Sequence, residues 1–175
     1  MYIKRSKLDA LKESKEFKRI NENYNKRILE HHSKYDIFLS HATDDKEVMQ
    51  LSKAYFEQQG KTVYVAEIDD FIPHKAKDIT KEHVEKIQHA MDISNAFYYV
   101  LSKCEKTSTW MPWELGYFDG KYGKVRKIGV LSIYDNSSDD EKNFEGHEYL
   151  KLYPHKEYDK IATDLDLILE HLKKM

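Results

Sequence analysis

The chain lacks the features that mark secreted and membrane-spanning proteins. Among its 175 residues there is a single cysteine, Cys104, so no disulfide can form within the chain and a reducing compartment fits best. The opening residues MYIKRSKLDALKESK have no apolar stretch of the kind that a signal peptide needs. No run approaches the roughly 20 apolar residues of a membrane-spanning helix. We therefore expect a cytoplasmic protein that makes no membrane contact of its own.

An excess of charge of one sign is also missing. The chain has 29 Lys and Arg against 31 Asp and Glu, a net charge of −2, which gives no general reason to bind nucleic acid. Its hydrophobic share of 40% is ordinary for a globular protein, and its length suits one domain. Only residues 1–34 are basic overall, and because both signs alternate there we interpret them as a solvated helical face.

The hydrophobic pattern alternates between the periods of helices and strands. An amphipathic helix is predicted over much of residues 6–30, packed on the domain or on another copy of the chain. Strands are predicted at 35–40, 61–66, 96–101, 127–133 and, as a short fifth strand, 149–153. Further helices are predicted at 44–60, around 84–91, at 110–121 and around 161–172, with a loop at 67–78 and a mobile acidic segment at 135–148.

Strands that alternate with helices predict an α/β fold, in which a mostly parallel sheet of about five strands has helices on both faces. In such sheets ligands bind beyond the carboxyl ends of the strands. The informative residues should therefore follow Ser40, Ala66, Leu101 and Ile133. We divide the chain into an N-terminal helical extension, residues 1–33, and a domain, residues 34–175.

Two runs that follow predicted strands resemble motifs of the Toll/interleukin-1 receptor (TIR) domain family. The run YDIFLSHATDDKE, residues 35–47, is similar to the first strand and helix of TIR domains. The run YYVLSKCEKTSTWMPWELG, residues 98–116, is similar to their third strand and the helix after it, with the spacing Trp-x-x-x-Glu. The resemblance covers residues 34–134 and implies a flavodoxin-like TIR fold.

Glu114 is the candidate catalytic residue. Trp110 and Glu114 are four residues apart, so they share one face of a helix. A carboxylate beside an indole at the rim of a parallel sheet suits a small-molecule site, whereas the alternative is a surface Glu on a helix whose Trp residues pack the core. The resemblance favours the first interpretation, because in catalytic TIR domains the matching Glu is required for cleaving NAD.

The resemblance implies that NAD is the substrate and that neither a cofactor nor a metal takes part. The nicotinamide of NAD is cationic and leaves as a neutral molecule, so one carboxylate can supply the stabilisation that the ribose needs. Asp69 and Asp70 are either ribose contacts or a solvated pair in the loop. The predicted substrate-binding residues are Phe38, Ser40, His41, Asp69, Asp70 and Trp110, of which Asp69 and Asp70 are named only for their place near the rim of the sheet.

The function predicted from the sequence is cleavage of the nicotinamide–ribose bond, with water giving ADP-ribose and an adenine nitrogen giving a cyclic isomer. The chain resembles the stand-alone TIR proteins of bacterial anti-phage systems such as Thoeris. Its expected partners are further copies of itself and a downstream effector that binds the product. Two alternatives stay open: a TIR scaffold that acts only by self-association, and a nucleoside deoxyribosyltransferase-like enzyme.

Three other patterns in the sequence do not match the sites that they first suggest. The glycines at 116, 120 and 123 do not follow a strand in the order of a dinucleotide-binding motif. His31 and His32 lack a nearby set of further metal ligands. A phospho-receiver domain would need an Asp after the third strand, where this chain has Ser102 and Lys103.

Overall fold

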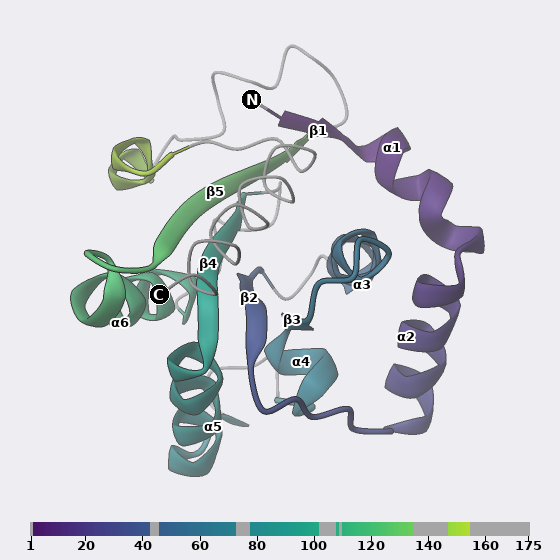
Figure 1. Cartoon of the computed structure of the whole chain (residues 1–175), viewed down its shortest axis with the longest axis horizontal. Helices are drawn as coiled ribbons and strands as arrows, with labels where there is room; N and C mark the ends of the chain where they lie inside the picture. Colours follow the sequence, from purple (N-terminus) through teal and green to yellow (C-terminus); the bar gives the residue numbers. More distant parts are fainter. Residues whose placement is uncertain are drawn as a thin grey trace, which may run out of the picture.

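Five parallel strands form a central sheet that carries helices on both faces (Figure 1). The computed structural model describes residues 2–42, 46–72, 78–101, 108, 110–134 and 147–154. Its strands are β1 (Tyr2–Lys4), β2 (Tyr35–Ser40), β3 (Val63–Tyr64), β4 (Ser94–Leu101) and β5 (Lys127–Tyr134). Its helices are α1 (Arg5–Asp9), η1 (Ala10–Glu13), α2 (Lys15–Lys26), α3 (Lys46–Glu57), α4 (Ala66–Asp69), α5 (Lys81–Asp92), α6 (Trp110–Tyr122) and η7 (Glu148–Leu152).

The strand order confirms the predicted flavodoxin-like α/β fold. The strands lie in the order β3-β2-β4-β5-β1, and every neighbouring pair is parallel. Apart from β1, this is the flavodoxin-like order in which the first strand of the domain lies between the second and the third. The fifth position, at the edge beside β5, is occupied by β1, in which Tyr2 pairs with Ser132. The N-terminal residues therefore complete the sheet, a role that the hydrophobic pattern did not predict.

The N-terminal region is not the single helix that we predicted for residues 6–30. It starts as β1, and its helical part is divided at Ser14, whose Oγ accepts a hydrogen bond from the amide of Phe17 and caps α2. Helix α2 ends at Lys26 because Arg27 takes a left-handed conformation, with φ of 52°. The predicted amphipathic character is confirmed, since Leu8 and Ile20 are buried. The boundary at residue 33 stays a prediction.

Alternation along β2 sends side chains into two separate cores. Ile37 and Leu39 join the core under α1, α2 and α3, which also contains Ile20 and Leu51. Phe38 joins the core under α5 and α6. Because Ser40 is two residues beyond Phe38, its side chain belongs to the same face of the sheet as α6. This alternation places the end of β2 next to α6.

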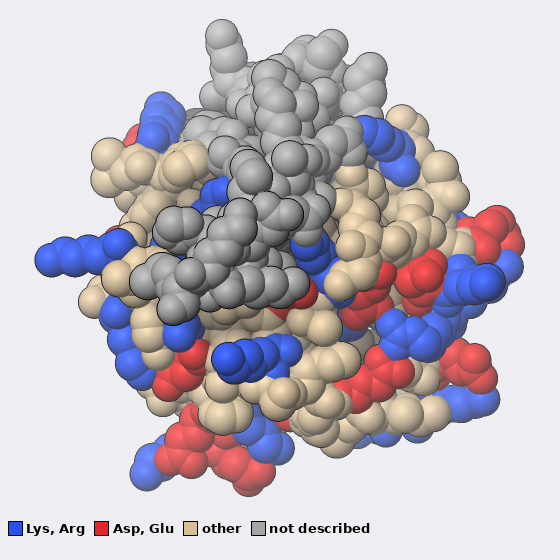
Figure 2. All heavy atoms as spheres, in the orientation of Figure 1, with Lys and Arg blue, Asp and Glu red and all other residues tan. Residues whose placement is uncertain are grey.

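The amphipathic face of the N-terminal region packs on its own domain. Leu11, Phe17 and Tyr24 lie against the core under α3. The charged side chains of α1 and η1 pair locally and with α3, as Arg5 and Lys12 both do with Glu47. Figure 2 shows acidic and basic side chains intermixed on the edge of the molecule that carries the N-terminal helices. This agrees with the predicted solvated face.

Two predictions for the connecting segments are wrong. Residues 148–152 form the 3-10 helix η7 instead of a fifth strand, because β1 occupies the sheet edge and Leu150 is buried beneath α6. A single main-chain hydrogen bond, from the Val130 amide to the Pro154 carbonyl, joins this segment to β5. Part of the predicted 67–78 loop is the short helix α4.

The other strands and helices follow the predicted pattern closely. The helix predicted to stop at Gly60 ends at Glu57, and Gly60 has a φ of 75°. The predicted closing helix at 161–172 and most of the acidic segment 135–148 lie outside the described residues. No helix in the described ranges is long and apolar enough to cross a membrane.

Candidate active site

Glu114 is a buried carboxylate at the carboxyl end of β2. It lies in α6, one turn after Trp110, and only 7% of the residue is exposed. The Oγ of Ser40 donates a hydrogen bond of 2.5 Å to its Oε2 atom. Ser40 is the last residue of β2, and its side chain faces α6 for the reason given above. Two segments that are far apart in the sequence thus meet where a parallel sheet binds ligands.

The carboxyl group of Glu114 has little to stabilise its charge. Burial raises its pKa from 4.5 to about 7, and the hydrogen bond from Ser40 opposes this rise. The negative charge of Glu67 raises the pKa further. No Lys or Arg within the described ranges forms an ion pair with Glu114. A buried carboxylate that titrates near neutral pH marks a candidate functional group.

A second pair of side chains lies at the same end of the sheet. His41 directly follows β2, and its Nε2 atom is 3.3 Å from the Oε2 atom of Glu67 on α4. Both side chains are largely buried, with 3% and 13% of their surfaces exposed. His41 was predicted from the sequence as a site residue, whereas Glu67 was not. Its position directly after the strand-end residue Ala66 was the available signal.

Trp110 begins α6 and lies one turn before Glu114, on the same side of the helix. Its ring packs edge-on against Trp113, with 5.4 Å between ring centroids. The Nε1 atom of Trp110 is buried and has no hydrogen-bond partner among the described residues. This indole therefore lies close to Glu114 with an unused donor.

Phe38 lies within the core. Only 1% of the residue is exposed, and its ring stacks on Phe97 at 5.5 Å and on Tyr64 at 5.3 Å. Phe38 thus packs the end of β2 against the core on the α5 and α6 side of the sheet. The structure does not place it on an open surface beside Glu114, so its predicted contact with substrate stays a prediction.

Asp69 and Asp70 are held by other groups. Both oxygens of Asp69 contact the Nζ atom of Lys53, at 3.0 and 2.9 Å, and one accepts a hydrogen bond of 2.7 Å from the Val65 amide. Asp70 accepts a hydrogen bond of 2.7 Å from the hydroxyl of Tyr64. The structure therefore does not bring these two carboxylates to Glu114.

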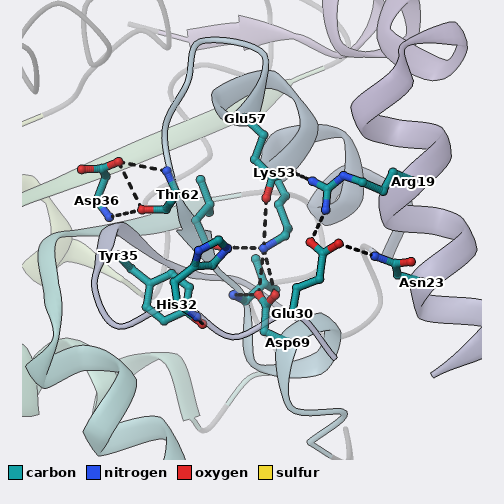
Figure 3. Close-up of polar contacts among 12 residues, drawn as sticks. Arg19, Asn23, Glu30, His32, Tyr35, Asp36, Lys53, Glu57, Thr62 and Asp69 are labelled. Atoms are coloured by element: carbon teal, nitrogen blue, oxygen red, sulfur yellow. Dashed lines mark hydrogen bonds and ion pairs between the residues drawn. The ribbon is translucent and has the colours of Figure 1, made fainter. Parts of the chain in front are cut away.

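Asp69 belongs to a buried charge network that reaches the N-terminal region (Figure 3). Lys53 also pairs with Glu57, which in turn binds the guanidinium of Arg19 in α2. The same guanidinium binds Glu30, whose other oxygen accepts a hydrogen bond from Asn23. We call the group formed by Arg19, Glu30, Lys53, Glu57 and Asp69 the Lys53 network. It joins α2, α3 and α4 on the face of the sheet opposite α6.

No metal-binding group is found in the part of the chain that the structure describes, where no three His, Cys, Asp or Glu side chains gather. Several side chains at the end of β2 could take part in a reaction. They comprise a carboxylate with a raised pKa, a hydroxyl bonded to it, and an imidazole paired with a second carboxylate.

The strand order and a Glu one turn after the Trp that begins α6 agree with the TIR-type α/β domain that the sequence resembles. Over 133 residues the chain is 38% identical to the probable 3' cyclic ADP-D-ribose synthase ThsB' of Bacillus cereus (strain MSX-D12). The match covers 76% of this chain and 63% of that protein, so the chain spans less than two thirds of this relative's length. The resemblance to TIR proteins that we identified in the sequence is confirmed by this relative.

Two further comparisons were made. Among solved structures, the TIR domain of the Toll-related receptor TRR-2 from Hydra magnipapillata matches with 18% identity and a TM-score of 0.42. That match covers 81% of this chain and 99% of the receptor domain. No protein-family model matches the chain.

Proposed function

We propose that the chain cleaves the nicotinamide–ribose bond of NAD, with Glu114 as the catalytic carboxylate. The observation that carries this proposal is a buried carboxylate at the carboxyl end of a parallel sheet, bonded to a hydroxyl and paired with no cation among the described residues. A relative whose name is that of a cyclic ADP-ribose synthase supports the choice of substrate.

To cleave the nicotinamide–ribose bond, the protein needs to supply little more than a negative charge near the ribose. When the bond between the ribose C1 atom and the nicotinamide nitrogen breaks, the bonding electrons leave with nicotinamide, which becomes neutral. The positive charge then develops on the ribose, and a carboxylate held beneath it stabilises the transition state. Glu114 is largely shielded from solvent, and a lower local dielectric constant strengthens this attraction. Ser40 keeps the carboxylate in one orientation.

An acceptor then completes the reaction at the ribose. Water gives ADP-ribose and loses a proton, whereas an atom of the same molecule gives a cyclic isomer. The name of the B. cereus relative favours the cyclic product for this chain as well. We further propose that the product is a signal in anti-phage defence, read by a downstream effector, and that the chain acts together with copies of itself.

The decisive experiment measures nicotinamide release from NAD by the wild-type protein and by Glu114→Ala, with products resolved by mass spectrometry. High protein concentration and a crowding agent are used so that self-association is not limiting. Glu85→Ala is the matched control, because Glu85 is an exposed residue of α5. We expect Glu114→Ala to lose at least a hundredfold of the rate, and the control to lose nothing.

Other outcomes would select another function. Equal release by wild type and Glu114→Ala would exclude Glu114 as the catalytic group. Transfer of deoxyribose between bases, with NAD left intact, would indicate the deoxyribosyltransferase-like alternative. An unchanged biological effect of Glu114→Ala would indicate the scaffold, although the N-terminal face proposed for self-association is covered by the domain's own core.

A further inference from the structure

The short helix α4 brings a second carboxylate to the Glu114 site. Glu67 is its second residue, and the contact with His41 at 3.3 Å joins α4 to the residue that follows Ser40. Ser40 in turn holds Glu114. A continuous set of contacts and chain neighbours therefore leads from Glu67 through His41 and Ser40 to Glu114.

The position of α4 is fixed from its other side. Asp69, at its last turn, accepts a hydrogen bond from the amide of Val65 just before the helix and pairs with Lys53 of α3. Lys53 also donates to the carbonyl of Val63 in β3. A four-residue helix has little intrinsic stability, so these bonds determine where Glu67 lies. Buried anchors of this kind allow a short helix to hold a side chain rigidly.

We propose that Glu67 is a positioning residue for the reaction at Glu114. Its carboxylate lies 3.3 Å from the imidazole of His41, the residue after Ser40, and so places a second negative charge at the end of β2 where Glu114 lies. This inference rests on the proposed function for its role in NAD cleavage.

The expected consequence is a coupling between the two carboxylates. The charge of Glu67 favours the protonated form of Glu114 and so raises its pKa, in addition to the larger effect of burial. The hydroxyl of Ser40 acts in the opposite direction. At the same level of the sheet β4 contributes the phenol of Tyr99, which pairs with Ser40 in the strand register. Residues 110–118 of α6 contain no other charged side chain.

The test compares wild type with Glu67→Gln, which removes the charge at nearly constant shape, and Glu67→Asp, which retains it. Glu85→Gln serves as the matched control. Carbon-13 NMR of labelled Glu carboxyls gives the titration of Glu114 in the ligand-free protein, and nicotinamide release from NAD is followed between pH 5 and 9. The two readouts separate the coupling from the reaction.

We expect Glu114 to titrate at lower pH in Glu67→Gln than in wild type, Glu67→Asp and the control. The rate at pH 6 relative to pH 8 should rise about threefold in Glu67→Gln, because more Glu114 is ionised at pH 6. An unchanged titration of Glu114 in folded Glu67→Gln would overturn the inference, whatever the enzyme activity. A shifted titration without nicotinamide release from any variant would uphold the coupling and reject NAD cleavage.

Discussion

Two buried carboxylates of this chain, Glu114 and Asp69, lie in opposite electrostatic surroundings. Both follow strands at the same end of the sheet. Glu114 is 7% exposed and Asp69 is 2% exposed. Asp69 is bonded to the ammonium of Lys53 and to a main-chain amide. Among the described residues, the hydrogen-bond partner of Glu114 is the hydroxyl of Ser40, and the nearby charge of Glu67 is negative. Asp69 therefore sits in a structural ion pair, while Glu114 sits in a site that disfavours its own charge.

The comparison shows how a protein distinguishes structural from reactive carboxylates. Burial raises the pKa of both groups, but Lys53 and the Val65 amide oppose that rise at Asp69. The charge of Asp69 is compensated by Lys53 and keeps α4 in place. The charge of Glu114 is not compensated by a cation among the described residues, so it is available to stabilise a cationic transition state. Ionising the buried Glu114 is unfavourable and therefore lowers the stability of the fold. Substitutions can measure this loss of stability.

The largest effect is expected for Asp69→Asn, which removes the shorter of the two ion pairs described for the buried ammonium of Lys53 and leaves the pair with Glu57. We expect it to lower the free energy of unfolding by about 3–5 kcal/mol, the range found when a buried ion pair loses one partner. Urea denaturation at pH 7 measures this loss. Asp78→Asn, at an exposed position, is the control and should change stability by less than about 0.5 kcal/mol. Equal stability of both variants would show that the Lys53–Asp69 pair contributes little.

Glu114→Gln should have the opposite effect on stability and abolish activity. In wild type the folded-state pKa of about 7 exceeds the ordinary 4.5, so stability is lost as pH rises from about 4.5 through 7. This linkage amounts to about 3 kcal/mol. Because glutamine never ionises, we expect the variant to be more stable than wild type by about 1–3 kcal/mol at pH 8, with the difference vanishing near pH 4.

Thermal unfolding of wild type and Glu114→Gln across this pH range tests the expectation. Glu85→Gln should follow wild type throughout, because Glu85 is exposed. A difference between Glu114→Gln and wild type that does not depend on pH would contradict a raised pKa at Glu114. Destabilisation at pH 8 would show that the charged form has a partner of its own.

Ser40→Ala removes the one hydrogen bond that favours ionised Glu114. The pKa of Glu114 should rise further, so the acidic limb of the pH–rate profile should move to higher pH. We expect the rate of NAD cleavage at pH 7 to fall about tenfold, the equivalent of about 1.4 kcal/mol, with partial recovery at pH 9. Ser40→Thr, which keeps the hydroxyl, is the matched variant. A uniform loss at every pH would indicate a steric role instead.

The smallest effect is expected at the outer end of the Lys53 network. Arg19→Gln breaks the pairs with Glu57 and Glu30, but the arginine side chain is 41% exposed and screened by solvent. We expect a loss of up to about 1 kcal/mol, which decreases at high salt. Lys18→Gln, which affects only an exposed pair with Glu13, should change nothing measurable. A loss as large as that of Asp69→Asn would mean that the whole network acts as one unit.

Much of the fold was predictable because periodicity is a local signal. The strands at 35–40 and 96–101 and the helix after Trp110 were predicted within a few residues. β1 was missed because three residues cannot show a period, and its pairing with β5 is a long-range contact. The predicted strand at 149–153 failed for the same reason, since the sequence does not reveal that the sheet edge is already occupied.

The candidate site was predictable only in part. The rule that ligands bind at the carboxyl ends of parallel strands pointed to the residues after Ser40 and Leu101, and the resemblance to TIR domains selected Glu114. The structure brings Ser40 into contact with Glu114. Asp69 was assigned to the same rim because sequence alone does not show Lys53 on the opposite face. Glu67 was missed because its contact with His41 depends on the path of α4, which tertiary bonds determine.

The pairing of β1 with β5 also sets an order of events during protein synthesis. Tyr2 is translated well before its partner Ser132, which belongs to the last strand of the described sheet in sequence order. At about 5–20 residues per second, the first strand waits on the order of ten seconds before its hydrogen bonds can form. During that interval β1 cannot pair, because β5 has not yet been synthesised. Until Ser132 has been synthesised, β1 therefore has backbone groups that a nascent-chain chaperone could bind.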